Sequence, residues 1–284
     1  MKKGDHFIVI DGKRFDAHEG ENVLHVALRN GISIPHFCYH EDLTVAGNCR
    51  ICLVELENGK VVPSCTIRAQ RNLKIKTNTL TVQYLRKENL ELLLAGHQKN
   101  CPKCRRKLLC PVKKQMQDLG ITGTQYDHDE KNCPLHKMGT AAEFDPALCI
   151  NCARCIQTCA DIGIGFLTFK NKGSKTHIWY NENPKVDCIY CGQCTLHCPV
   201  GAVREQSHIE EVEKVLADKN KIVIVQTAPS VRASIGEEFG MPIGEDVTRK
   251  LATAYRLMGF DKIFDVNMGA DITTIVEAQE LVER

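Results

Sequence analysis

The residues with the most distinctive chemistry in this sequence are its 16 cysteines, which fall into clusters, with only Cys133 standing apart. Disulfides would require an oxidising compartment. The N-terminus, MKKGDHFIVIDGK, offers only four consecutive apolar residues, too few for the core of a signal peptide, and no segment approaches the length of a membrane span. We therefore expect a cytoplasmic protein without membrane contact, in which reduced thiols bind metal and Cys133 is unliganded.

The most specific pattern is a doubled cysteine motif, CINCARCIQTC (149–159) and CIYCGQCTLHCP (188–199). Each copy reads C-x₂-C-x₂-C-x₃-C, the spacing of bacterial ferredoxins that carry two [4Fe–4S] clusters, in which the fourth cysteine of each motif serves the other cluster. Two-residue gaps curl the backbone so that three thiolates reach one cluster. Zinc sites normally use two separated C-x₂-C pairs, which makes zinc the weaker interpretation. The predicted ligands are Cys149, Cys152, Cys155 and Cys198 for one cluster, and Cys188, Cys191, Cys194 and Cys159 for the second.

A second group of cysteines, Cys38, Cys49, Cys52 and Cys65, has the C-x₂-C pair and outlying cysteines typical of a [2Fe–2S] site. Plant ferredoxins use a four-residue first gap, and the ten-residue gap here departs from that spacing. It resembles instead the [2Fe–2S] domain at the front of complex I large subunits and iron-only hydrogenases. Zinc remains the alternative for these four residues.

The segment HQKNCPKCRRKLLC (97–110) carries one histidine and three cysteines. Taken alone, a Cys₃His set favours structural zinc. Between the neighbouring patterns it resembles the His-Cys₃ [4Fe–4S] site of the same hydrogenase and complex I family, with the spacing H-x₃-C-x₂-C-x₅-C. That resemblance makes His97, Cys101, Cys104 and Cys110 the predicted ligands. Because a neutral imidazole replaces a thiolate, we expect an altered reduction potential.

Seven basic residues and no acidic ones lie between Lys99 and Lys114. They form either a solvated face or a set of charges that offsets cluster charge or docks a partner. Nucleic-acid binding is not expected, because no aromatic platform accompanies them and the net charge of the chain is only +2. The sequence offers no catalytic residue outside the cluster ligands.

The elements that must position these residues follow from turn signals and periodicity. Expected in the first 200 residues are a hairpin at 7–17, a helix at 22–30, a hairpin turning at Asn58-Gly59, a helix at 79–96, an irregular connector at 111–140 and a hairpin at 165–180. The remainder alternates helix (209–218), strand (221–228), helix (246–258), strand (261–266) and helix (272–283). This alternation predicts an α/β unit with parallel strands.

The predicted fold class is therefore α+β and multidomain. We expect a β-grasp [2Fe–2S] domain at 1–78, a His-Cys₃ [4Fe–4S] domain with its connector at 79–140, a two-cluster ferredoxin-like domain at 141–204 and a truncated, hydrogenase-like α/β segment at 205–284. The expected cofactors are one [2Fe–2S] cluster and three [4Fe–4S] clusters.

The last part of the chain carries a further resemblance. VIVQTAPSVRASIGEEFGMPIG (223–244) and RKLATAYRLMGFDKIFDVNMGADITTIVEAQEL (249–281) look like the opening of the catalytic domain of iron-only hydrogenase large subunits. In that family the active-site H-cluster hangs from cysteines further on, and this sequence has no cysteine after Cys198 and no TSCCP-like segment. The resemblance thus implies a chain truncated before the H-cluster ligands, with a docking role for residues 205–284.

Such a chain resembles the iron–sulfur subunit of a cytoplasmic, flavin-based electron-bifurcating transhydrogenase of the Stn type. The resemblance implies a flavoprotein partner related to the NADH-binding subunits of complex I, a second flavoprotein with an NADP site, and ferredoxin, with FMN or FAD and NAD(P) held by the partners. No Gly-rich dinucleotide loop occurs in this chain, in keeping with that division. The alternatives are an electron-transfer subunit of a bifurcating [FeFe]-hydrogenase or formate dehydrogenase complex, and a zinc-based interaction protein.

Overall fold

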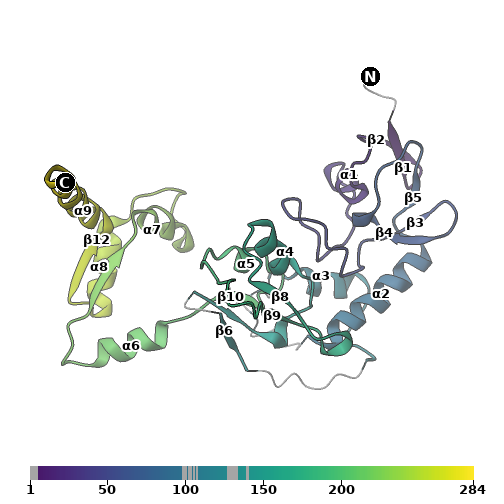
Figure 1. The fold of residues 1–284 in the computed structure, drawn as a ribbon. Coiled ribbons are helices and arrows are strands. Elements are labelled where there is room, and N and C mark those ends of the chain that lie inside the picture. Colours follow the sequence, from purple (N-terminus) through teal and green to yellow (C-terminus); the bar gives the residue numbers. More distant parts are fainter. Residues whose placement is uncertain are drawn as a thin grey trace. The chain divides into compact units, whose positions relative to one another are not determined.

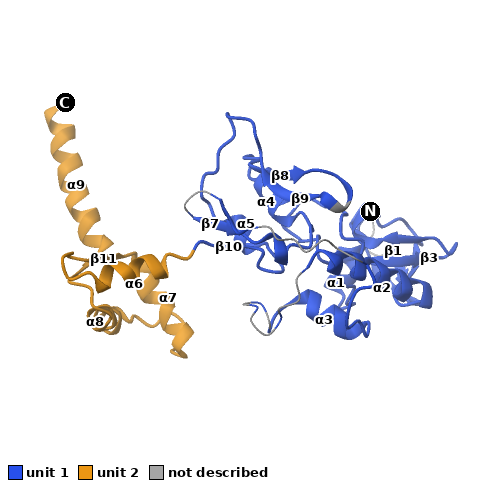
Figure 2. Ribbon diagram, turned by 90° about the horizontal axis from the view of Figure 1, so that it is seen from below, with its two compact units in different colours: residues 1–206 blue, residues 207–284 orange. Residues whose placement is uncertain are grey.

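A computed structural model describes residues 6–97, 101, 104, 106, 108–126, 134–138 and 141–284. The chain divides into two compact units, residues 1–206 (unit 1) and 207–284 (unit 2) (Figures 1 and 2). The finer boundaries at 78 and 140 remain predictions.

The first sheet of unit 1 is five-stranded and mixed, with strand order β2-β1-β5-β3-β4. Its strands are β1 (Phe7–Ile10), β2 (Lys13–Asp16), β3 (Leu53–Leu56), β4 (Val61–Pro63) and β5 (Lys74–Lys76). The β1–β2 turn has positive φ at both Asp11 and Gly12, as the predicted Asp-Gly hairpin requires. The second expected hairpin is β3–β4, paired antiparallel across the Asn58-Gly59 turn. β1 and β5 are parallel, an arrangement compatible with the predicted β-grasp domain.

Two helices accompany this sheet, α1 (Val23–Arg29) and α2 (Leu80–Ala95). The side chain of Asn22 caps α1 by accepting from the His25 N–H, and the Thr79 hydroxyl caps α2 by accepting from the Val82 N–H. α1 buries four residues in a core shared with Ile8 and Ile10 of β1. α2 packs near β3 and contributes Leu90 and Leu94 to a second core.

The expectation of an irregular connector at 111–140 is wrong for two described parts of that range. Residues Pro111–Asp118 form α3, and His136–Met138 form β6. Pro111 occupies the first turn of α3, where its missing N–H costs nothing, and the Lys114–Asp118 ion pair spans one turn at 2.7 Å. β6 exists because it pairs with β7 (Ala142–Phe144), a tertiary contact that polar composition does not reveal.

The doubled motif of residues 149–199 lies among short elements. These are α4 (Arg154–Asp161), β8 (Leu167–Lys170), β9 (His177–Tyr180), α5 (Gln193–Leu196) and β10 (Val203–Glu205). β8 and β9 form the predicted hairpin, with Leu167 opposite Tyr180, and β10 joins β7 and β6 in a three-stranded sheet. Each helix begins inside a cysteine motif, so the helices fix where the thiols lie. Short 3₁₀ turns occur at η1 (Ser64–Thr66), η3 (Pro146–Leu148) and η4 (Gly173–Lys175).

Unit 2 is an α/β unit built on two parallel strands, as the sequence predicts. Its elements are α6 (Ile209–Ala217), β11 (Ile224–Thr227), α7 (Pro229–Ser234), η5 (Ile235–Phe239), α8 (Thr248–Met258), β12 (Lys262–Asp265) and α9 (Val266–Glu283). The expected start of the last helix at residue 272 is wrong. α9 begins at Val266 because the Asp265 carboxylate accepts from the Asn267 N–H at 2.9 Å and caps it.

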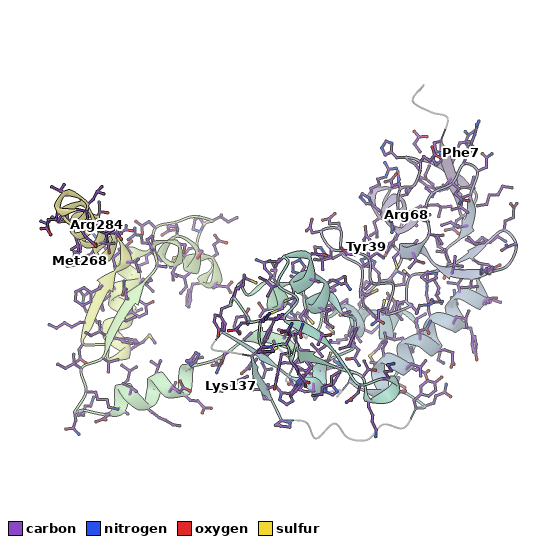
Figure 3. The ribbon with its side chains drawn as sticks, in the orientation of Figure 1. Phe7, Tyr39, Arg68, Lys137, Met268 and Arg284 are labelled. Atoms are coloured by element: carbon purple, nitrogen blue, oxygen red, sulfur yellow. The ribbon has the colours of Figure 1, made fainter. Side chains whose placement is uncertain are left out.

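Large apolar side chains remain exposed along α9. Every residue of this helix is exposed or half-buried. Met268, Ile272, Ile275 and Val276 follow helical spacing and are each more than half exposed. Met268 is labelled near the start of the helix in Figure 3. Together they form an apolar stripe that unit 2 does not cover.

The hydropathy of the helices bears on the membrane question. Across the described ranges, none of the helices combines the length and the apolar character needed to cross a bilayer.

The two cores of unit 1 predict unequal sensitivity along α2. Leu90 is fully buried, whereas Leu92, two residues on, is 53% exposed. Leu90→Ala should lower the free energy of unfolding of unit 1 by about 2–5 kcal/mol, because it removes apolar contacts and leaves a cavity. Leu92→Ala, the matched control, should stay within about 0.5 kcal/mol. Chemical denaturation of the full chain, followed by hydrogen exchange in α2, would measure both; equal effects would contradict the assigned core.

Candidate metal centres

The four cysteines of the first group are brought together by the five-stranded sheet. Cys52 directly precedes β3 and Cys65 lies in η1, directly after β4; the β3–β4 pairing opposes Leu53 to Pro63 and so places these two cysteines side by side. Each of the four is at most 3% exposed. The Cys49 and Cys65 thiols hydrogen-bond to the Cys38 sulfur and lower the pKa of Cys38. The Cys65 thiol also hydrogen-bonds to Cys52, so all four sulfurs are linked.

The backbone around this first site is held in place by hydrogen bonds. The Cys49 N–H donates to the Cys38 sulfur at 3.5 Å, and Arg50, the next residue, adopts a left-handed conformation with φ 55°. Ser64 donates to the Cys52 carbonyl twice, from its N–H and its hydroxyl, both at 2.8 Å. The Asn22 side chain donates to the Cys65 carbonyl. The loops are therefore positioned by the protein itself.

The doubled motif surrounds two cavities. One is lined by Cys149, Cys152, Cys155 and Cys198 together with apolar residues such as Phe144 and Ile178. The other is lined by Cys159, Cys188, Cys191 and Cys194. The last cysteine of each motif thus lines the cavity of the other motif, which is the grouping that the sequence analysis predicts.

Left-handed residues curl the two motifs in the same way. The third residue of each motif, Asn151 or Tyr190, has φ of 51° or 57°, and the fifth, Ala153 or Gly192, has φ of 69° or 73°. As a result the Asn151 N–H donates to the Cys149 sulfur at 3.3 Å and the Tyr190 N–H to the Cys188 sulfur at 3.4 Å. Three of these four residues are not glycine, and such a conformation costs of order 1 kcal/mol each. Surrounding contacts must impose it.

Further amides point at the cysteines that cross between the motifs. The Phe166 N–H donates to the Cys159 sulfur at 3.2 Å, and the Ala202 and Val203 N–H groups donate to the Cys198 sulfur at 3.2 and 3.4 Å. Donors to sulfur are the contacts expected around an iron–sulfur cluster.

The chemistry of these donor sets fits iron–sulfur clusters. Burial raises the pKa of Cys152 to about 12 and the pKa of Cys155 well above its usual range, so isolated thiolates are disfavoured there unless a bound group shares their charge. Among the described residues, no three His, Cys, Asp or Glu side chains are placed to hold a single metal ion. When bound, iron–sulfur clusters supply one-electron transfer. Ligation by the named cysteines remains a prediction.

The histidine of the third group is tied to the doubled motif. His97, buried just after α2, bonds through Nδ1 to the Leu148 carbonyl at 2.9 Å. A carbonyl only accepts, so Nδ1 carries the proton and Nε2 is the nitrogen available to a metal. Because Leu148 precedes Cys149, one peptide links the two candidate sites.

The three cysteines of this group occupy separate local positions. The Cys104 N–H donates to the Cys101 carbonyl at 3.3 Å, and Cys110 directly precedes α3. Several neighbours, including Lys99, Arg105 and Lys107 of the basic stretch, lie outside the described residues, as does Cys133. The His-Cys₃ ligand set therefore stays a prediction.

Sequence reasoning missed the polar residues that support these sites. The Leu148 carbonyl, Arg86 and Arg154 all make long-range contacts next to predicted ligands. The only sequence signal was the place of Arg154 inside the CARC segment, between two cysteines. Its contact, 115 residues away, has no local signature.

Comparisons with protein families divide the chain as follows. A 2Fe-2S iron-sulfur cluster binding domain matches residues 7–80, and the NADH-ubiquinone oxidoreductase-G iron-sulfur binding region matches 86–125. A 4Fe-4S dicluster domain matches 148–202. The C-terminal domain of iron-only hydrogenase large subunits matches 221–284.

Related proteins extend the same pattern. The NADP-reducing hydrogenase subunit HndD of Solidesulfovibrio fructosivorans is 37% identical over 98% of this chain and 49% of its own length. Iron hydrogenase 1 of Clostridium pasteurianum is 36% identical, with the same coverage. A subunit of the NADH-quinone oxidoreductase of Rickettsia prowazekii is 31% identical over 82% of this chain and 37% of its own length. The chain thus spans about half the length, or less, of these curated relatives.

A solved structure agrees with the fold. A chain of an NAD⁺-reducing [NiFe]-hydrogenase in the H₂-reduced state superposes with a TM-score of 0.66 at 25% identity, covering 72% of this chain and 88% of that one. The domain matches and cysteine sites define an iron–sulfur protein of the oxidoreductases. More particularly, the chain belongs to the iron–sulfur proteins related to iron-only hydrogenase large subunits and to the corresponding iron–sulfur subunits of NADH-quinone oxidoreductase. The resemblance of residues 223–281 to the hydrogenase domain is confirmed.

The crossed grouping predicts an outcome specific to Cys159. Although this residue lies in the first motif, Cys159→Ala should deplete the cluster of the Cys188 motif and leave the Cys149 set loaded, lowering iron by at most about four atoms per chain. Cys155→Ala is the matched variant and should deplete the other cluster. Iron and sulfide analysis with EPR spectroscopy would distinguish them. If Cys159→Ala affected the Cys149 set instead, the crossed assignment would be wrong.

The histidine predicts a change of potential without loss of the cluster. His97→Cys should retain the [4Fe–4S] cluster and lower its reduction potential, because a thiolate adds negative charge where the imidazole was neutral. EPR-monitored redox titration measures this, with His177→Cys, on an exposed edge of β9, as control. An unchanged potential in the His97 variant would show that the histidine is not a ligand.

Proposed function

We propose that this chain is the iron–sulfur electron-transfer subunit of a flavin-based electron-bifurcating oxidoreductase complex. The observation that carries the proposal is that one core of unit 1 contains cysteines from two predicted sites, Cys38 and Cys49 of the first and four of the doubled motif. Sites packed into one core are held a short, fixed distance apart. A chain of redox centres needs that property, and a zinc-based interaction protein does not.

The route between sites is supported by direct contacts. Thr44, in the loop between Cys38 and Cys49, donates to the Asp161 carboxylate from its N–H at 2.8 Å and from its hydroxyl at 2.7 Å. His40 packs edge-on against His197, the residue before Cys198, with ring centroids 4.9 Å apart. These contacts hold the loop of the first site against the doubled motif.

Within this class we propose a transhydrogenase, in which flavoprotein partners hold FMN or FAD and the NAD(H) and NADP(H) sites, and ferredoxin is the third redox partner. One flavoprotein is of the NADH-binding type of complex I. The names of the relatives, an NADP-reducing hydrogenase and an NADH-quinone oxidoreductase, support nicotinamide-linked partners. The apolar stripe on α9 is typical of a surface covered in an assembly, which supports placing the chain in a complex.

The second candidate is the same electron-transfer role in a bifurcating [FeFe]-hydrogenase or a formate dehydrogenase complex. The match of residues 221–284 to the hydrogenase domain favours it. Residues 207–284 contain no cysteine, so this unit offers no thiolate to a further cluster. An assay of the complex must separate the two candidates.

The proposal predicts both cluster content and activity. Anaerobically purified complex should contain about 14 irons in this chain, from one [2Fe–2S] and three [4Fe–4S] clusters. With reduced ferredoxin and both nicotinamides, it should exchange electrons between NAD and NADP in a ferredoxin-dependent way, without hydrogen.

Three other results would reject parts of this proposal. Hydrogen production would favour the hydrogenase complex, and formate oxidation the dehydrogenase. Zinc-replete, iron-poor protein would contradict electron transfer altogether.

A further inference from the structure

Two arginines in unit 1 are buried without a carboxylate partner. Arg86, on α2, is only 6% exposed, and Arg154 begins α4 with its Nε fully shielded from solvent. Neither forms an ion pair with an Asp or Glu in the part of the chain that the structure describes. The Nε atoms of both also have no hydrogen-bond acceptor among those residues. Burying a cation without an anion is strongly unfavourable, so an anion is expected nearby.

Arg154 connects the doubled motif to the first site. It lies between Cys152 and Cys155, yet its Nη2 donates to the carbonyl of Tyr39, the residue after Cys38. Tyr39 is on the loop side of the first sheet in Figure 3. Residues that flank predicted ligands of both sites, Phe37 and Pro199, line one pocket with Arg154.

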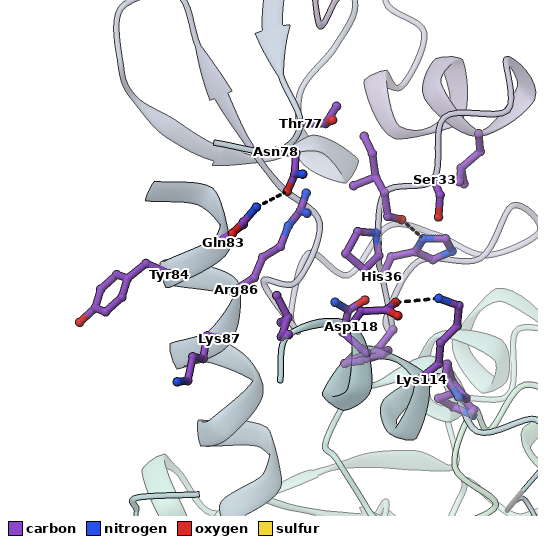
Figure 4. Close-up of a pocket in the computed structure, with 18 of the residues that line it drawn as sticks. Ser33, His36, Thr77, Asn78, Gln83, Tyr84, Arg86, Lys87, Lys114 and Asp118 are labelled. Atoms are coloured by element: carbon purple, nitrogen blue, oxygen red, sulfur yellow. Dashed lines mark hydrogen bonds and ion pairs between the residues drawn. The ribbon is translucent and has the colours of Figure 1, made fainter. Parts of the chain in front are cut away.

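That pocket, of about 1040 Å³, separates the two arginines (Figure 4). Arg86 projects from α2, and His36 lies across from it. Lys114, at the same pocket, is already paired with Asp118. The Arg86 Nη2 donates to the Leu53 carbonyl at 2.6 Å, next to Cys52. Arg86 therefore borders the first site only, on the side away from the doubled motif.

The thiols that act on each arginine differ accordingly. Burial lowers the pKa of Arg154, and four thiolates oppose that shift: Cys152 and Cys198 from the doubled motif, and Cys38 and Cys49 from the first site. Burial lowers the pKa of Arg86 to about 10, opposed by Cys52 and Asp11. The charge of Arg154 is thus felt at two sites and that of Arg86 at one.

We propose that Arg154 is a positioning residue whose buried positive charge is shared between the [2Fe–2S] site and the Cys149–Cys198 [4Fe–4S] site, and that it holds both at higher reduction potentials. The inference rests on the proposed clusters, which with four thiolates each carry net negative charge that grows on reduction. A nearby buried cation stabilises the more negative, reduced form. Its bond to Tyr39 keeps that charge between the two sites.

The test is an EPR-monitored redox titration of the loaded full chain. In Arg154→Gln, the potentials of the [2Fe–2S] cluster and of the Cys149-set cluster should both fall, while that of the Cys188-set cluster stays unchanged. Arg154→Lys keeps the charge and should recover most of both shifts. In Arg86→Gln, the comparison variant, only the [2Fe–2S] potential should fall.

Arg50 provides the matched control for exposed charge. It follows Cys49 directly but is exposed, so solvent screens it, and Arg50→Gln should leave both potentials nearly unchanged. If Arg154→Gln shifts only one potential, or neither, the shared charge is refuted.

Failure of the variant to load clusters is also decisive. If Arg154→Gln does not load but Arg154→Lys does, with wild-type potentials, the charge is what the sites require. If neither variant loads, the role of Arg154 is steric and the proposal fails. A wild-type chain that shows no [2Fe–2S] or [4Fe–4S] signals would instead overturn the proposed function, independently of Arg154.

Discussion

Packing of cysteine sulfurs into a common apolar core is the constraint on which the arrangement of unit 1 depends. Cys38 and Cys49 share this core with Cys149, Cys152, Cys155 and Cys198, and Ile51, Leu90 and Leu94 fill the space among them. Protein cores are close-packed and transmit displacement, so a shift at one set of thiols would strain the others. The sheet of the first domain and the helices of the doubled motif therefore act as one scaffold.

Local signals carried much of the site into the sequence analysis. The hairpin at Asp11-Gly12, the Asn22 helix start and the repeated C-x₂-C-x₂-C-x₃-C spacing are all short-range patterns, and the structure places the crossing cysteines, Cys159 and Cys198, in the cavities expected for them. What the sequence could not show depends on distant partners. β6 forms because β7 lies beside it, and Arg154 gains its meaning from Tyr39.

The two motifs also show the fold overriding residue preference. Gly192 suits a left-handed position, but the equivalent residue of the first motif is Ala153, with nearly the same φ. The N–H groups that this curl directs at sulfur, together with burial at the start of α4, hold the alanine there. A prediction based on glycine alone would have placed the turn in one motif and missed it in the other.

The two cavities of the doubled motif differ in how far solvent reaches them. Cys149, Cys152, Cys155 and Cys198 are each at most 8% exposed, whereas Cys191 is exposed and Cys188 and Cys194 are half-buried. Oxidants attack accessible sulfur first. In air, damage would therefore begin at the outer set and spread inward, and a partly aged sample would keep its inner centre after the outer one had decayed.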